Sequence, residues 1–339
     1  MNLHDLLADK LPAGELSRIS SLSQAQEIEK GGGTRRFFRV CRDNDVPAIV
    51  CLYDDSKAEN FLYAGIANFM RKIGVPAPEI FFHDAQRRVL VMEDFGEVDL
   101  WTLRAENSPA TNTAYRSALA EIAKLHRDGL KNLGATEIMR DGFNADYYKW
   151  ERDYFLVNAA KKAHKICISG AANADLANEL AALATMLLAQ PPQLVHRDFQ
   201  SQNILWHDNR ARFIDFQGMR VGTGWYDVAS LLFDPYVGIG DNERSALLAF
   251  YCDEMEIPPQ TRNNAEKIFY CAAAQRLMQA IGAYFFLSAE CNKPRFRKFA
   301  LPALENLKIA ASRSGRLPFL NMLATELASR ERRRLALGL

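Results

Sequence analysis

The sequence has almost no net charge, since its 42 lysine and arginine residues are balanced by 41 aspartate and glutamate residues, which leaves a formal charge of +1. A chain with this balance has no overall electric field that would draw it to nucleic acid or to an anionic membrane surface. We therefore expect neither nucleic acid nor membrane among its partners.

Long apolar runs are also missing. The most apolar segment, Cys271–Ala289, is interrupted by two glutamines and an arginine, and it falls short of the roughly 20 apolar residues that a membrane helix needs. The first residues carry Asp5 and Asp9 without a basic cluster, unlike a signal peptide. These observations favour a soluble protein of the cytoplasm.

Paired cysteines and domain linkers are missing as well. The six cysteines are scattered singly, and no two have the Cys-x-x-Cys spacing typical of zinc or redox sites. We expect reduced core thiols and no metal site of the Cys/His type. Without an internal repeat or a linker rich in Gly, Ser or Pro, the chain is expected to form lobes of one fold.

The first 95 residues have the pattern of a small sheet with helices. Residues 3–8 and 14–22 have helical spacing, and Ala58–Ile73 is an amphipathic helix that stops at Gly74. Short runs with strand character, separated by turn residues, lie around this helix at residues 26–29, 37–41, 48–53, 79–82 and 89–92. The resulting order is β-β-β-α-β-β.

Beyond Gly96 the periodicity becomes helical, apart from one strand-rich stretch, Gln193–Gly218. The helical segments are 114–130, 147–165, 174–189, 243–254, 263–288 and 302–311. The sequence therefore predicts an α+β fold with an N-lobe over residues 1–95 and a mostly helical C-lobe over residues 96–339.

One segment has a spacing that suits phosphoryl transfer. His196-Arg197-Asp198 is followed by Asn203, five positions after the aspartate, and then by Asp215 at a strand end 17 residues after Asp198, which fits the catalytic loop of kinases. This chemistry needs an aligned acceptor hydroxyl and divalent cations. We expect Asp198 to orient that hydroxyl, and Asn203 and Asp215 to offer oxygen ligands to Mg²⁺.

These motifs resemble the aminoglycoside-phosphotransferase-like small-molecule kinases, which have a protein-kinase-like two-lobed fold. Tyr226-Asp227-Val228-Ala229 is similar to their YDLA signature, and no APE signature of protein kinases follows. The resemblance implies ATP and Mg²⁺ as cofactors, and it implies that His196 and Asp227 support the catalytic loop. Taken alone, Asp227 could be a helix N-cap, a role that is compatible with support of the loop.

A narrower resemblance is to the N-acetylmuramate/N-acetylglucosamine 1-kinases of bacterial cell-wall recycling. It rests on residues 33–40 (GTRRFFRV), 198–203 (DFQSQN) and 215–217 (DFQ), and on Gln275-Arg276 with the later Gly282 and Lys293-Pro294. The resemblance implies an N-acetylated amino sugar phosphorylated at its anomeric hydroxyl. Gln200 and Gln202 depart from the His and Arg of that family.

The nucleotide contacts follow from the same resemblance. Gly32, Gly33, Thr34 and Arg35 would lie near the phosphates, although the glycine run alone could be a plain turn. The stretch 93–95, with Glu93 and Phe95, falls where the hinge would bind adenine. The third strand lacks the expected lysine, since Val50, Cys51 and Leu52 stand there. That leaves four candidate cations for the phosphates: Arg35, Arg36, Arg39 and Lys57.

Arg220 and Arg276 are the candidate substrate residues. Arg295 is also available, and Asp234, Asp241 and Glu243 follow the Tyr226-Asp227 motif, so the mixed charge suits a neutral or carboxylate-bearing sugar better than a polycation. Two alternatives stay open: a kinase of the same fold that acts on an aminoglycoside, a choline-like alcohol or homoserine, and a pseudokinase that only binds. The oligomeric state is not indicated.

Overall fold

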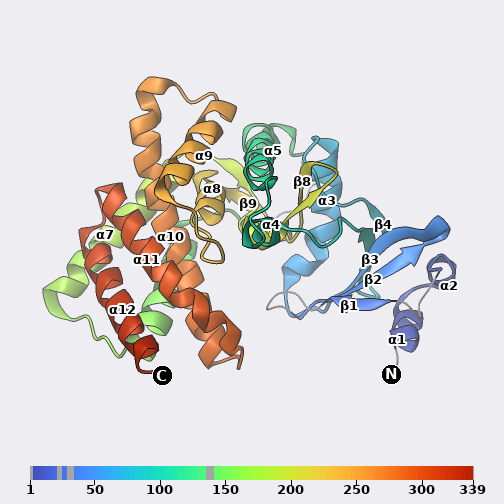
Figure 1. Ribbon diagram of the computed structural model, residues 1–339, viewed down its shortest axis with the longest axis horizontal. Helices are drawn as coiled ribbons and strands as arrows, with labels where there is room; N and C mark the ends of the chain where they lie inside the picture. Colours follow the sequence, from blue (N-terminus) through green and yellow to red (C-terminus); the bar gives the residue numbers. More distant parts are fainter. Residues whose placement is uncertain (1–2, 21–24, 29–33, 135–140, 339) are drawn as a thin grey trace.

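The computed structural model describes residues 3–20, 25–28, 34–134 and 141–338. Its N-terminal part is a five-stranded antiparallel sheet in the order β1-β2-β3-β5-β4 (Figure 1). The strands are β1 (Gln26–Ile28), β2 (Arg36–Arg42), β3 (Val46–Leu52), β4 (Ile80–Asp84) and β5 (Val89–Glu93). The predicted two-lobed α+β fold is confirmed.

Helices cover both faces of this sheet because side chains alternate along each strand. Val50 of β3 belongs to the core beneath α1 (Leu3–Lys10) and α2 (Ala13–Leu16). Its neighbour Cys51 belongs to the larger core that includes η3 (Ala58–Leu62) and α3 (Tyr63–Lys72). The sheet is thereby buried on two sides.

The helix predicted over residues 14–22 is wrong beyond its first turn. The chain leaves the helix after Leu16, and Ile19 forms a β-bridge with Arg42. The backbone N–H of Ser20 donates to the carbonyl of Cys41 at 2.9 Å. Pairing with β2 thus satisfies backbone groups that a longer helix would have bonded within itself.

The C-terminal part is mostly helical and occupies the other end of an elongated molecule, so the two termini lie far apart (Figure 1). Its first elements are α4 (Leu100–Ala105), α5 (Thr111–Asn132), α6 (Ala145–Phe155), the π-helix η4 (Leu156–Ala163) and α7 (Gly170–Leu188). The last are α8 (Trp225–Leu232), α9 (Asp241–Glu254), α10 (Arg262–Ala289), η7 (Pro294–Phe299), α11 (Ala300–Ser314) and α12 (Pro318–Ala336).

Helix α10 forms the centre of this part, since α6, α8 and α11 all pack on it. The helix predicted over 147–165 begins as α6 and continues as the π-helix η4. The change follows Tyr154 and Phe155, where the backbone of α6 meets Gly282 of α10. None of the helices in the described ranges has both the length and the apolar character that crossing a bilayer requires.

The strand-rich stretch supplies three strands of two small antiparallel pairs, and the fourth strand lies just beyond it. In one pair β6 (Gln193–Val195) lies beside β9 (Arg220–Gly222), and in the other β7 (Ile204–His207) lies beside β8 (Arg210–Phe213). The short helix η5 (Ser201–Asn203) leads into β7. These pairs bring together the motif residues that the sequence places over 196–227.

Candidate active site

The β7–β8 hairpin brings Asn203 and Asp215 to the same end of the pair. Asn203 directly precedes β7, Asp215 follows β8 by two residues, and Ile204 lies opposite Phe213. The backbone N–H of Ile214 donates to the carbonyl of Asn203 at 3.0 Å, which closes this end. Two oxygen donors that are twelve positions apart in sequence are therefore neighbours in space.

Asp198 lies in the loop between β6 and η5, and Asn203 joins it to the hairpin. The side-chain amide of Asn203 donates to the carbonyl of Asp198 at 2.8 Å. With its nitrogen engaged in this bond, the amide presents its oxygen elsewhere. The Asp198 carboxylate itself is about one third exposed, at 32%, so it is accessible to a ligand.

Two buried carboxylates at the two ends of α8 hold this loop. Asp227 accepts the backbone N–H groups of His196 at 2.6 Å and of Arg197 at 2.8 Å, the type of contact that the family resemblance implies. Asp234 accepts both the N–H and the hydroxyl of Ser201, at 2.8 and 2.6 Å. Charge-assisted bonds of this kind fix the backbone firmly.

Part of this support was not found from the sequence. His126 of α5 lies with its Nε2 3.1 Å from Asp227, and its only sequence signal is a histidine on the apolar face of a predicted helix.

His196 is fully buried, and its Nε2 lies 3.0 Å from the carbonyl of Ile214. Its ring packs against three phenylalanines, Phe199, Phe213 and Phe216.

Two motif residues have left-handed backbone conformations, which are rare for residues other than glycine. Arg197 has φ of 77° and Asp215 has φ of 65°. Such conformations persist where the surroundings hold them, and they concentrate at functional sites. Here the hydrogen bond that the Arg197 N–H donates to Asp227 holds Arg197. The bond that the neighbouring Ile214 N–H donates to the Asn203 carbonyl holds Asp215.

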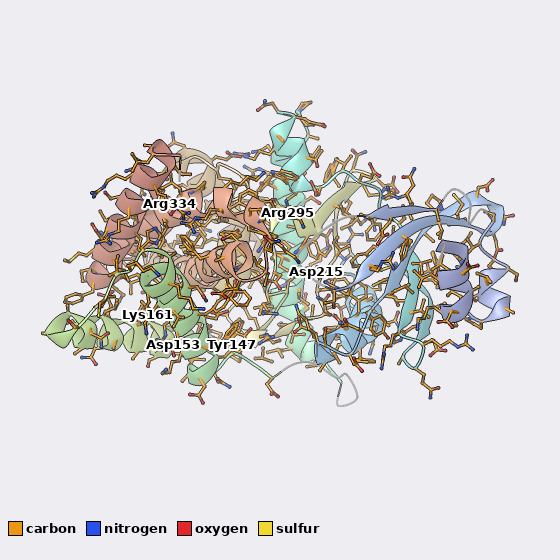
Figure 2. The ribbon with its side chains drawn as sticks, turned by 90° about the horizontal axis from the view of Figure 1, so that it is seen from below. Tyr147, Asp153, Lys161, Asp215, Arg295 and Arg334 are labelled. Atoms are coloured by element: carbon orange, nitrogen blue, oxygen red, sulfur yellow. The ribbon has the colours of Figure 1, made fainter. Side chains whose placement is uncertain are left out.

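Asp215 lies at the boundary between the sheet and the helical part (Figure 2). Its carboxylate forms an ion pair with Arg35 and accepts a hydrogen bond from the Gln217 amide at 2.9 Å. Burial acts to raise the pKa of Asp215, but the charge and hydrogen bond of Arg35, with the bond from Gln217, prevail and lower it to about 2. Asp215 is therefore ionised at neutral pH.

Arg35 occupies the neighbourhood where the third-strand lysine is missing. Phe37 of β2 pairs with Cys51 of β3, and Arg35 lies two residues before Phe37, near Cys51 and Tyr63. Burial raises the pKa of the Cys51 thiol to about 12, so the thiol is neutral. Of the four candidate cations, Arg35 is the one that contacts Asp215.

The other candidate cations have different partners. Arg36 pairs with Glu27 at 2.7 Å on the surface, and Arg39 pairs with Asp94 at 2.5 Å and also with Glu97. Lys57 is exposed.

The predicted nucleotide-binding residues lie only in part within the described ranges. Gly32 and Gly33 lie outside the described residues. Thr34 is exposed, and its hydroxyl donates to Asp54 at 3.0 Å. Glu93 ends β5, and its carboxylate accepts the backbone N–H of Glu79 at 3.1 Å.

Phe95 is 2% exposed and packs beneath the guanidinium of Arg212. Protein contacts thus occupy the side chains of both predicted hinge residues, Glu93 and Phe95. Backbone groups are what this stretch can offer to a ligand.

The Asp198 carboxylate lies between two arginines. The Nη1 atom of Arg197 and the Nη2 atom of Arg276 each lie 3.7 Å from one of its oxygens. Arg276 is buried in α10, where its Nε donates to Ser230 at 3.1 Å and its Nη1 to Gln279. Of the two predicted substrate arginines, Arg276 is therefore the one in contact with Asp198.

Arg220 lies elsewhere on this side of the site. Its Nε donates to the carbonyl of Gly218 at 3.0 Å, and its guanidinium stacks over the ring of Tyr147 at 4.4 Å. Burial lowers the pKa of Arg220 and raises that of Tyr147.

A fully buried carboxylate, Glu151 of α6, was missed by sequence reasoning. It accepts hydrogen bonds from Tyr226 at 2.7 Å and from Gln275 at 2.9 Å, and burial raises its pKa. Its only signal in the sequence is an acidic residue on the buried face of a helix.

The oxygen donors fit a hard divalent cation. In the part of the chain that the structure describes, no group of three or more His, Cys, Asp or Glu side chains could hold a metal ion. One carboxylate from Asp215 and one amide oxygen from Asn203 suit Mg²⁺, which keeps several waters and takes few protein ligands. Asp215 would have to exchange its Arg35 contact for the cation.

Comparisons with known proteins show which proteins this chain is similar to. The model of the phosphotransferase enzyme family matches residues 24–262, more than half of the chain. The N-acetylmuramate/N-acetylglucosamine kinase of Pseudomonas putida is 22% identical over 303 residues, which cover 87% of this chain and 84% of the relative. The protein of the same name from Neisseria meningitidis serogroup B is 23% identical over 311 residues, with 88% of each covered.

The fold is shared with a solved structure of a choline/ethanolamine kinase family protein from Mesorhizobium loti. The two superpose with a TM-score of 0.64 at 18% sequence identity, covering 95% of this chain and all of the other. An identity this low shows likeness of fold alone.

Proposed function

Because the chain belongs to the phosphotransferase enzyme family, we propose that it is a kinase that transfers the γ-phosphoryl group of ATP to a sugar hydroxyl. The acceptor is the anomeric hydroxyl of N-acetylmuramate or N-acetylglucosamine. In support of these acceptors, two relatives that match most of the chain are named N-acetylmuramate/N-acetylglucosamine kinase. We place the reaction in bacterial cell-wall recycling, in the cytoplasm.

One observation carries the proposal. Asp198 is held between Arg197 and Arg276 at 3.7 Å on one side, and its backbone is bonded to Asn203 on the other. A carboxylate that lies beside two arginines, in the same loop region as the oxygen ligands Asn203 and Asp215, can orient a hydroxyl towards a metal-bound phosphate.

The roles of the chain's own residues follow from these contacts. Bound Mg²⁺ would neutralise phosphate charge, and Asn203 and Asp215 would hold it. Arg35, buried beside Asp215, takes the phosphate role of the missing lysine. We place adenine against the backbone of residues 93–95 and the phosphates near residues 32–35. This makes residues 1–95 the nucleotide lobe and residues 96–339 the acceptor lobe.

The charge near Asp198 favours a sugar over a polycationic acceptor. Arg197, Arg220 and Arg276 are all on this side, and Arg197 also lies 3.8 Å from Glu59. An aminoglycoside needs a surplus of carboxylates instead. A neutral sugar, or one that carries a carboxylate such as muramate, is compatible with three arginines.

The test is turnover of ATP by the purified protein with a panel of acceptors in Mg²⁺, followed by phosphorus NMR of the product. We expect an anomeric phosphate on an N-acetylated hexosamine. Phosphate on another hydroxyl, or activity confined to choline, homoserine or aminoglycosides, would replace the proposed acceptor. Nucleotide binding without turnover on any acceptor would identify a pseudokinase.

A further inference from the structure

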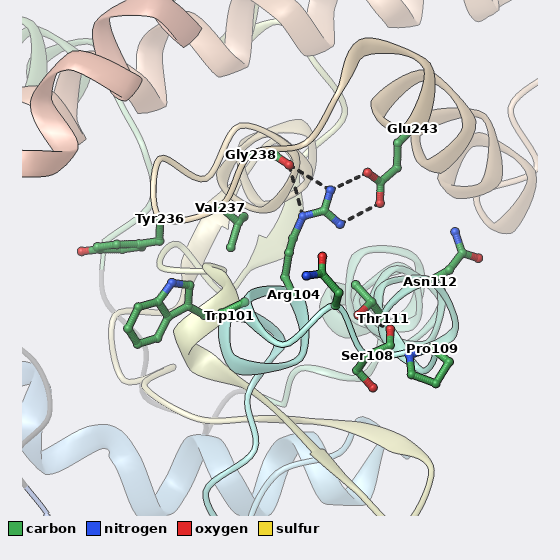
Figure 3. A pocket seen from close by; sticks show the side chains of 12 residues that line it. Trp101, Arg104, Ser108, Pro109, Thr111, Asn112, Tyr236, Val237, Gly238 and Glu243 are labelled. Atoms are coloured by element: carbon green, nitrogen blue, oxygen red, sulfur yellow. Dashed lines mark hydrogen bonds and ion pairs between the residues drawn. The ribbon is translucent and has the colours of Figure 1, made fainter.

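A pocket of about 640 Å³ lies beside the catalytic loop, and none of the residues discussed above as catalytic contributes to it. It opens between α4 with its following turn and the segment that joins α8 to α9 (Figure 3). Its walls include Trp101, Arg104, Asn107, Asn112, Tyr236 and Glu243. This volume is within the range of about 300–1,000 Å³ that is typical of small-molecule sites.

The pocket adjoins the site at Asp198. Helix α4, which supplies Trp101, packs directly on η5 of the catalytic loop. Tyr236 lies two residues after Asp234, the residue that holds Ser201, and its own N–H donates to that carboxylate at 2.9 Å. The Tyr236 ring also packs against Tyr284 of α10, the helix that supplies Arg276. Tyr236 therefore lies between the pocket and the proposed acceptor site at Asp198.

The pocket has no uncompensated charge. The guanidinium of Arg104 is bonded by both carboxylate oxygens of Glu243, at 2.9 and 2.5 Å, and by the carbonyl of Gly238, at 2.9 and 3.2 Å. Arg104 and Glu243 are the two charged residues among those that line it. An anionic or cationic ligand would find no counter-charge here, so the chemistry favours a neutral one.

The remaining surface combines an aromatic face with short polar groups. Trp101 is 37% exposed and borders the opening, and amide and hydroxyl side chains follow it along the turn after α4. Aromatic rings give a broad contact surface, while amides and hydroxyls can donate and accept hydrogen bonds. A sugar ring has a matching apolar face and a rim of hydroxyls.

We propose that this pocket is a second saccharide subsite, which binds the sugar unit attached to the ring being phosphorylated. The inference rests on the proposed function, because it assumes that the sugar ring being phosphorylated binds with its anomeric hydroxyl at Asp198. The attached unit then extends past Tyr236 to Trp101. The preferred acceptor is accordingly a short N-acetylated amino-sugar oligosaccharide with a free reducing end.

The test compares N-acetylglucosamine with its β-1,4-linked disaccharide as acceptors for the parent protein and for Trp101→Ala. We expect the parent kcat/KM to be at least about tenfold higher for the disaccharide than for N-acetylglucosamine. An effect of this size is typical of an aromatic side chain that contacts a ligand. Trp101→Ala should remove that preference, and Trp101→Phe should restore most of it. Trp150→Ala is the control, since Trp150 is 49% exposed on α6 and is not part of the pocket.

The outcomes separate the two proposals. Equal use of both sugars by the parent, or a preference that survives Trp101→Ala, would overturn the subsite and leave the kinase assignment standing. If neither sugar is phosphorylated, the proposed function fails, and direct titration with the disaccharide then decides the subsite. Binding weakened by Trp101→Ala but not by Trp150→Ala supports it, and absence of binding overturns it.

Discussion

At the scale of single residues, the Asp198 carboxylate has a role that its surroundings make testable. Its backbone is fixed by Asn203 and its oxygens are exposed between two arginines. In a loose transition state the incoming hydroxyl needs alignment and a late proton acceptor more than early deprotonation.

We expect Asp198→Asn to lower kcat at least about 10²-fold, as for loss of a positioned acid–base group, while KM changes far less. The variant keeps the size and one hydrogen-bond acceptor but loses the charge. Steady-state kinetics beside circular dichroism provide the measurement. A folded variant with kcat within a few-fold of the parent would show that this loop does not perform the chemistry.

Asp215 is held ionised beside Arg35, with its pKa lowered to about 2. Asp215→Ala should abolish Mg²⁺-dependent turnover, and Asn203→Ala should weaken the metal dependence less, because an amide oxygen is the weaker ligand. The control is Asp208→Ala at the exposed tip of the same hairpin. Near-normal kcat for a folded Asp215→Ala at ordinary Mg²⁺ would contradict the metal assignment.

The sequence named each of these residues, but it could place only some of them together, for a physical reason. Asp198, Asn203 and Asp215 lie within one loop and hairpin, so their spacing alone places them together. Arg35, just before β2, and Arg276, in α10, lie far from this loop in sequence, and only tertiary packing brings them to it. Among four candidate cations, sequence could not choose Arg35.

At the scale of elements, the strands of the sheet and most of the long helices were predicted because their side-chain periods are regular, whereas α12 was not among the helical segments predicted. No sequence pattern predicted β9, which has three residues and exists through its pairing with β6. The helix proposed over 14–22 failed because Ile19 pairs with β2. Local sequence patterns therefore predict long amphipathic helices and strands that pair with neighbours in sequence. They do not predict short elements that form only by pairing with a distant segment.

The contact between α10 and α6 depends on a glycine. A Cβ built on Gly282 would lie 2.8 Å from Tyr154 Cδ1 and 3.0 Å from the backbone of Tyr154 and Phe155. Gly282→Ala should therefore destabilise the protein by about 1–3 kcal/mol through overpacking.

Gly65 of α3 offers a matched control for this prediction. It is exposed, and nothing lies within 4 Å of a Cβ built on it. Gly65→Ala should raise stability by about 0.5–1 kcal/mol, because alanine loses less backbone entropy in a helix. Urea unfolding of both variants checks the pair, and equal effects of the two substitutions would refute the close-packing argument.

At the scale of the whole molecule, a buried carboxylate adds to the apolar packing that holds the C-terminal helix α12 against the rest of the helical part. Glu331 is 1% exposed and accepts two hydrogen bonds from Arg297 of η7, at 2.8 and 2.7 Å. His164, which follows η4, lies with its Nε2 3.0 Å from the same carboxylate. Three segments that are far apart in sequence thus meet at Glu331.

This cluster predicts how global stability changes in acid. Burial acts to raise the pKa of Glu331, but the bonds from His164 and Arg297 prevail and lower it from 4.5 to about 2. A carboxyl whose pKa is lower in the folded state stabilises fully above its unfolded pKa, and that stability is lost as pH falls from about 5 towards 2. The shift corresponds to about 3 kcal/mol at neutral pH.

We therefore expect Glu331→Gln to lower the free energy of unfolding by about 3 kcal/mol at pH 7, with the difference from the parent shrinking below pH 5. Glu326→Gln on the same helix is the control, because its pair with Arg330 is exposed and such pairs contribute little. Urea unfolding measured from pH 7 down to pH 3 provides both curves. A Glu331→Gln deficit that stays constant across this range would mean that packing around the side chain, and not the ionised carboxylate, secures α12.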